Sequence, residues 1–129
     1  MSMNEGIVYR PIGRVENAFR EPAPPQTFAG SSSRIVVDPA LAAGLEGLEP
    51  GSQVMVIFHC HRSQGYELRQ HPRADPERPK RGVFALHSPR RPNPIGISTV
   101  ELVAVAGNVL TVRDLDALDG SPVLDLKPA

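Results

Sequence analysis

The sequence has no tryptophan, a single cysteine and few aromatic residues, which make up 5% of its 129 residues. One cysteine, Cys60, cannot form an internal disulfide, which fits a reducing compartment. No apolar run approaches the roughly 20 residues that a membrane helix needs. The opening residues Met1–Glu5 have neither the basic nor the apolar segment of a secretory signal peptide. We therefore expect a cytoplasmic protein without a membrane segment.

The formal net charge is zero, because 14 basic and 14 acidic residues cancel. The overall charge thus gives no general argument for a nucleic-acid partner. The basic residues are unevenly placed, however, and half of them lie between Arg69 and Arg91, where the only acids are Asp75 and Glu77. Guanidinium groups suit phosphate recognition. We predict an RNA-phosphate patch made of Arg78, Lys80, Arg81, Arg90 and Arg91.

Proline is abundant, with 14 residues, and an interior proline costs a helix about 3 kcal/mol. Short apolar stretches between turn residues indicate strands instead, at residues 34–38, 53–60, 82–86, 97–105, 109–114 and 122–126. The stretch 53–60 is continuously apolar, which predicts a strand buried on both faces. Residues 39–48 form the one convincing helix, with Asp38 as N-cap and Pro39 at its first position.

The remaining segments, residues 20–33, 64–80 and 88–96, are proline-broken and predict long loops. Many short strands with one short helix predict a mainly β protein, a barrel or a sandwich, in a single domain spanning residues 1–129. No Gly-x-Gly-x-x-Gly motif follows a strand, so a Rossmann-type nucleotide site is not expected.

Two histidines, His59 and His61, are two positions apart and on a strand would share one face, opposite Cys60. Zinc sites have three or four ligands at tighter spacing, so we predict no metal site and expect one histidine to line a pocket. We expect Cys60 to be a small core residue rather than a nucleophile. The carboxylates of Asp116 and Asp119 lie in a turn and are able to face a cationic ligand.

Several segments together resemble the TsaA-like family, also called TrmO or YaeB-like. They are residues 9–15 (YRPIGRV), 56–59 (VIFH), 82–98 (GVFALHSPRRPNPIGIS) and 118–128 (LDGSPVLDLKP). The most specific part is RPNPIG with its partner DGSP. Members are methyltransferases that use S-adenosylmethionine and act on N6-threonylcarbamoyladenosine beside the tRNA anticodon. The resemblance implies a single-sheet β-barrel unlike the common α/β methyltransferase fold, a homodimer, and tRNA as the partner.

The resemblance also implies which residues contact the cofactor: Pro24, Pro25, Gln26, His59, Cys60, His87, Ile97, Asp116, Ala117, Leu118 and Asp119. Many relatives have arginine where this chain has His87, which implies a weaker or pH-sensitive contact. The acceptor nitrogen is a poor nucleophile, so a proton acceptor would assist the transfer. We predict that His59 or Asp119 has this catalytic role, while Arg90 and Arg91 hold RNA phosphates.

Two alternatives stay open at this point. Relatives often continue beyond the position of Ala129 with a Pro-Tyr-containing segment. Without that segment, the first alternative is an enzyme that uses the same cofactor and methylates a small molecule. Such an enzyme would be insensitive to salt, because it would make no phosphate contacts. The other alternative is a non-catalytic module that binds S-adenosylmethionine or RNA, and it would show binding without turnover.

Overall fold

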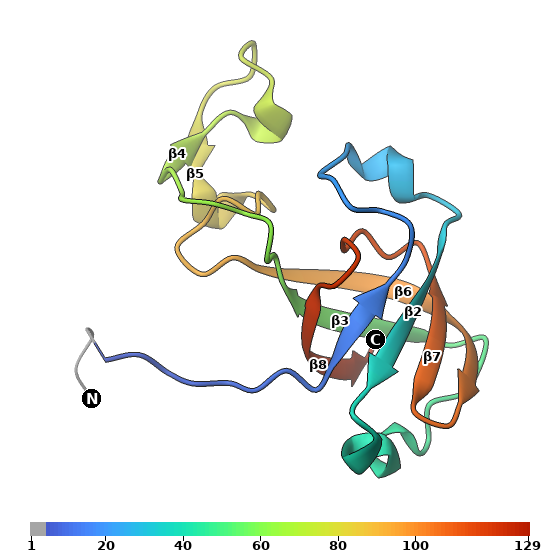
Figure 1. Cartoon of the computed structure of the whole chain (residues 1–129). Helices are drawn as coiled ribbons and strands as arrows, with labels where there is room; N and C mark the ends of the chain where they lie inside the picture. The colour runs from blue at the N-terminus through green and yellow to red at the C-terminus, as the bar shows by residue number, and fades with distance from the viewer. Residues whose placement is uncertain (1–4) are drawn as a thin grey trace.

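The computed structural model describes residues 5–129, except for the side chain of Pro25. Six antiparallel strands form a closed barrel in the order β1-β2-β7-β6-β3-β8 (Figure 1). Their bounds are Gly13–Glu16 (β1), Ser32–Val37 (β2), Gln53–His59 (β3), Ile95–Ala106 (β6), Val109–Arg113 (β7) and Pro122–Pro128 (β8). The predicted mainly β, single-sheet barrel is confirmed, and so is the hairpin around Gly107-Asn108, which joins β6 to β7.

The barrel interior is the hydrophobic core. In β3, Val54, Val56 and Phe58 point inward and are at most 6% exposed, whereas Met55 and Ile57 point outward and are only half-buried. The prediction of burial on both faces of this strand is therefore wrong. A sheet closed on itself has one inner face, so alternate residues must face outward. The outward-facing Met55 and Ile57 are therefore partly accessible on the outer wall of the barrel.

The predicted helix exists, but as the 3-10 helix η2, Pro39–Leu45. Its start is as expected, because Asp38 accepts a hydrogen bond from the Ala40 backbone at 3.0 Å. It ends at Leu45 rather than Leu48, since Gly47 takes a positive φ of 98°. Further 3-10 helices within the described residues are η1 (Pro25–Phe28), η3 (Pro72–Ala74) and η4 (Val83–Ala85). None of the helices in residues 5–129 has the length and apolar character of a membrane span.

A small two-stranded sheet, β4 (Arg69–Gln70) with β5 (Arg81–Gly82), projects from the barrel (Figure 1). We call residues 64–86 the arm. The strand predicted at 82–86 is wrong beyond Gly82, because the chain turns into η4 after the Val83 amide bonds the Leu68 carbonyl at 2.8 Å. The turn buries Val83 and leaves Phe84 79% exposed.

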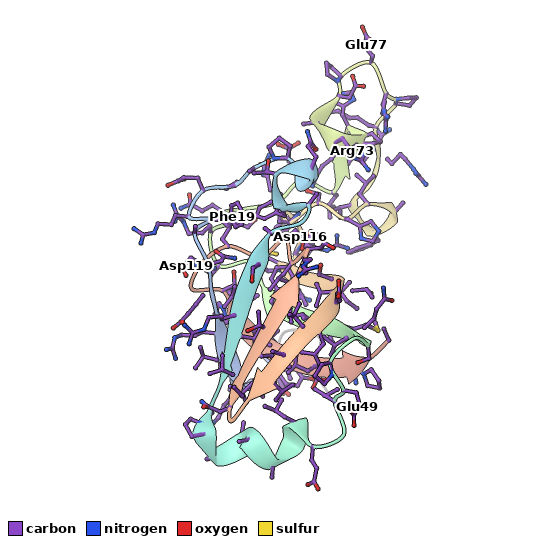
Figure 2. All side chains as sticks on the ribbon, turned by 90° about the vertical axis from the view of Figure 1, so that its right-hand side faces the viewer. Phe19, Glu49, Arg73, Glu77, Asp116 and Asp119 are labelled. Atoms are coloured by element: carbon purple, nitrogen blue, oxygen red, sulfur yellow. The ribbon has the colours of Figure 1, made fainter. Side chains whose placement is uncertain are left out.

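The direction of the strands decides where the connections lie. Because the strands alternate around the barrel, the segments 17–31, 60–94 and 114–121 all emerge at the same end. The η2 helix and the Gly107-Asn108 turn lie at the other end. Figure 2 shows Phe19, Asp116 and Asp119 at the end nearer the arm and Glu49 at the opposite end. We call the first of these the loop end.

Candidate active site at the loop end of the barrel

Asp119 joins the late connection, residues 114–121, to the early one, residues 17–31. One carboxylate oxygen, Oδ1, accepts a hydrogen bond from the Asn17 amide at 3.0 Å. The Asp119 amide donates to the Phe19 carbonyl at 2.7 Å. No protein group bonds the second oxygen, Oδ2, among residues 5–129, and this oxygen is not buried. Asp119 therefore has one oxygen fixed by the fold and one open to a ligand.

Asn17 joins the loops of this site and was missed by the sequence analysis. Its side-chain nitrogen donates to the Ser33 hydroxyl at 3.0 Å and to the Ala117 carbonyl at 2.9 Å. Its side-chain oxygen accepts from the Phe19 amide at 2.9 Å. Ser33 is 2% exposed and Asn17 is half-buried, so water reaches only part of this junction. An asparagine directly after a strand signals only a turn in sequence. The structure shows that it ties β1, β2 and both loops together.

Cys60 directly follows the last residue of β3, is half-buried and packs against the core. Burial raises the pKa of its thiol, the Asp116 carboxylate raises it too, and the Arg91 guanidinium opposes them. At neutral pH the thiol is protonated and a poor nucleophile. Asp116 and Arg91 thus both lie near Cys60. The Arg91 guanidinium also donates to the carbonyls of Leu86 and Ser88, at 2.9 and 3.1 Å, which fixes the proline-rich loop.

The two histidines around Cys60 face different surroundings. His59 is the last residue of β3, points outward beside its partner Ile95, and lines a shallow groove of about 340 Å³ on the barrel wall. His61 lies beyond the strand and is exposed at the loop end, where Nδ1 is 3.3 Å from the Ser121 hydroxyl. The condition for a shared face is not met, because the strand ends at His59, and of the two histidines only His59 lines this groove while His61 is exposed.

The early loop is held by an aromatic pair. The rings of Phe19 and Phe28 lie 4.8 Å apart and are tilted by 58°, and Phe28 is 4% exposed. This pairing leaves Pro24 and Gln26 exposed on the loop between the two rings. The predicted contact by Pro25 lies outside the described side chains.

The other predicted cofactor residues divide between two places. In the late turn, Ala117 is buried and Leu118 is half-buried, next to Asp116 and Asp119. His87 is exposed in the long connection. Ile97 is 51% exposed on the outer wall of β6, where it pairs with Ile57. The loop end therefore collects most of the predicted set, and His59 and Ile97 face the outer wall instead.

Two arginines of the predicted phosphate patch form ion pairs with carboxylates of this chain. Arg78 lies 3.6 Å from Asp75, and Arg90 lies 3.3 Å from Glu67. Exposed ion pairs of this kind contribute about 0–1 kcal/mol, so a phosphate is able to displace them. Lys80 and Arg81 are exposed and form no ion pair within residues 5–129. The described residues bring together no three histidine, cysteine or acidic side chains that could hold a metal.

The fold and the site define a small closed β-barrel that presents carboxylates and a histidine on three loops at one end. Residues 14–129 match the family model of the tRNA-methyltransferase O N-terminal domain. The chain belongs to this family.

Named relatives and a solved structure are similar over most of the chain. A probable S-adenosyl-L-methionine-binding protein of Pyrococcus abyssi is 44% identical over 126 residues, covering 95% of this chain and 67% of that protein. One of Methanothermobacter thermautotrophicus is 44% identical over 125 residues, covering 95% of this chain and 89% of that protein. The crystal structure of TrmO from Pseudomonas aeruginosa superimposes with a TM-score of 0.75 at 30% identity. It covers 97% of this chain, which spans only 56% of that structure.

Proposed function

We propose that this protein binds S-adenosylmethionine at the loop end and transfers its methyl group to N6-threonylcarbamoyladenosine in tRNA. The observation that carries the proposal is the carboxylate of Asp119, which the fold holds at the loop end with Oδ2 open. The family match and the printed names of the relatives support the same cofactor. In this proposal residues 1–129 form one domain of the family, and the protein works in the cytoplasm.

The residues at the loop end fit this cofactor. S-adenosylmethionine supplies an electrophilic methyl group on a positively charged sulfonium. The carboxylates of Asp116 and Asp119 match that charge, and the half-buried, protonated Cys60 adds an apolar surface without a competing nucleophile. Orienting two reactants removes much of the barrier of a bimolecular transfer. The chain's contribution is therefore to position the reactants, exclude water and accept a proton.

We place the binding surface for the RNA partner on the arm and on the proline-rich loop that follows it. Lys80 and Arg81 are exposed on the arm, while Arg78 and Arg90 are held only in exposed ion pairs. Arg91 has a second role, because it fixes the loop through two carbonyls. Binding that depends on such cations weakens as salt rises. Methyl transfer that falls steeply between low and physiological salt supports tRNA, and salt-insensitive transfer supports a small-molecule acceptor.

The first test is to titrate the protein and its Asp119→Asn variant with S-adenosylmethionine by calorimetry. Asparagine keeps the side-chain oxygen that accepts from the Asn17 amide and removes the charge. We expect wild-type binding to be saturable. We expect the variant to bind roughly 10- to 150-fold more weakly, because a charge-assisted contact contributes about 1.5–3 kcal/mol.

The matched control is Asp125→Asn, which removes a carboxylate that pairs with Lys127 at 3.3 Å on β8. It should leave the affinity unchanged. Equal affinity of the wild type and Asp119→Asn would overturn the role of Asp119. A folded wild-type protein that binds no S-adenosylmethionine would overturn the proposed cofactor. Binding of S-adenosylmethionine without methyl transfer to threonylcarbamoylated tRNA would overturn the proposed activity and indicate a non-catalytic binding module.

We also propose a homodimer that uses the outer wall of β3 and β6. On this wall Ile57 of β3 pairs with Ile97 of β6, Met55 pairs with Thr99 and His59 pairs with Ile95, and the side chains of Ile95 and Ile97 are 46% and 51% exposed. Contiguous exposed apolar side chains are typical of interfaces. A dimer through this wall would place His59 and Ile97 at the subunit boundary, which accounts for predicted site residues that face away from the loop end.

Ile95→Glu is expected to shift the protein from dimer to monomer in sedimentation equilibrium, because it places a charge in an apolar contact. Leu41→Glu is the control, since Leu41 is 47% exposed but lies on η2 at the opposite end of the barrel. A wild-type protein that sediments as a monomer at every concentration tested would contradict the dimer.

A further inference from the structure

The Ser121 hydroxyl lies next to one ring nitrogen of His61, 3.3 Å from Nδ1. This hydroxyl donates to the Leu118 carbonyl at 2.7 Å, and the residue is 1% exposed. A serine hydroxyl has one hydrogen, so the same oxygen acts as an acceptor toward His61 Nδ1, 3.3 Å away. This arrangement favours the neutral tautomer of His61 that carries its proton on Nδ1 and its lone pair on Nε2.

Nε2 faces the turn that holds the candidate ligand carboxylate. A β-carbon at Gly120 would come within 3.6 Å of this nitrogen, so the imidazole edge lies against the backbone beside Asp119. The ring is exposed, and Nε2 has no hydrogen-bond partner among residues 5–129. Gly120 has a positive φ of 83°, a conformation that suits glycine and leaves this edge uncovered.

The other histidines are placed differently. His59 points to the outer wall. His71 is used inside the arm, where Nδ1 lies 2.7 Å from the Arg78 carbonyl. His87 is exposed and makes no side-chain hydrogen bond within the described residues. Of the four histidines in the chain, His61 alone combines a tautomer favoured by a buried group with a place on the Asp119 turn.

We propose that His61 is the proton acceptor in methyl transfer and that Ser121 is its positioning residue. The inference rests on the proposed function and deepens it. As the acceptor nitrogen forms its bond to the methyl carbon, the carbon–sulfur bond breaks and its electron pair stays on sulfur. The N–H proton moves to Nε2, so the positive charge of the sulfonium ends on the imidazolium. The imidazolium then gives its proton to water.

The decisive comparison is His61→Ala with His61→Asn. Asparagine places a side-chain N–H close to the position of Nδ1, so it keeps a donor for Ser121 and removes the base. We expect both variants to lower kcat on threonylcarbamoylated tRNA by roughly 100-fold or more, the usual range for a general base. The affinity for S-adenosylmethionine, measured by calorimetry, should change less than twofold. Added imidazole should restore part of the activity of His61→Ala.

Full activity of His61→Asn would overturn the proposal, because it would show that the hydrogen bond to Ser121 is all that His61 supplies. A second readout needs no substrate. Long-range ¹⁵N–¹H spectra of the free protein should show the proton of His61 on Nδ1, and Ser121→Ala should mix the two tautomers. A proton on Nε2 in the wild type would overturn the inference whatever the reaction is. Absence of cofactor binding by the wild type would instead overturn the proposed function.

Discussion

Asn17→Ala is expected to lower the free energy of unfolding by about 3 kcal/mol, because it removes three hydrogen bonds at a half-buried junction. The loss includes the cost of leaving the buried Ser33 hydroxyl and two backbone groups without this partner. For a domain of this size the melting temperature should fall by roughly 10 °C. Thermal and urea unfolding followed by circular dichroism measure both quantities.

The same substitution should weaken S-adenosylmethionine binding, since the Asn17 side chain holds the Ala117 carbonyl against the early loop. Asn108→Ala is the matched control. Asn108 donates one hydrogen bond, to the Val37 carbonyl at 2.6 Å, in the turn at the opposite end. We expect it to cost about 1 kcal/mol and to leave the affinity unchanged. If both variants weakened binding equally, the effect would come from global stability and not from the loop end.

Asn17 also illustrates what local sequence pattern cannot supply. Five of the six barrel strands and the β6–β7 hairpin could be predicted, because short apolar stretches and the Gly107-Asn108 turn are encoded by neighbouring residues. The contacts of Asn17 reach Ser33, Ala117 and Asp119, up to 102 residues away, and no pattern around position 17 signals them. The resemblance to a known family indicated the loops of the site. It did not indicate the residue that joins them.

His61 was missed for a different reason. On the assumption that the strand continues past His59, His61 would share the outer wall with it. The strand ends at His59, two residues before His61, because the Cys60 amide bonds the Pro94 carbonyl at 2.7 Å and the chain turns. Two residues of strand length thus decide whether His61 lies on the wall or at the loop end. Element boundaries are the least reliable part of any sequence-based prediction.

Gly96→Ala is expected to destabilise the protein by about 3 kcal/mol, although it adds only a methyl group. Gly96 lies opposite Phe58 in the β3–β6 ladder, and an added β-carbon would come within 2.6 Å of the Phe58 ring. Phe58 is 6% exposed in the barrel core, so the ring cannot move without opening the sheet or leaving a cavity. Overpacking a core by one methyl group costs about 1–3 kcal/mol. Chemical unfolding measures this change.

The double-mutant cycle with Phe58→Leu shows whether the ring is the cause. The smaller side chain should make room for the methyl group, so the double variant should be more stable than the sum of the single effects predicts, by about 1 kcal/mol or more. Gly13→Ala is the contrasting case, because its β-carbon would meet the Val36 carbonyl oxygen and the Val37 α-carbon, which are backbone atoms that no side-chain change can move. Strict additivity for Gly96 and Phe58 would contradict the packing explanation. The glycine of the RPNPIG motif would then have to be required by the site itself and not by the barrel beneath it.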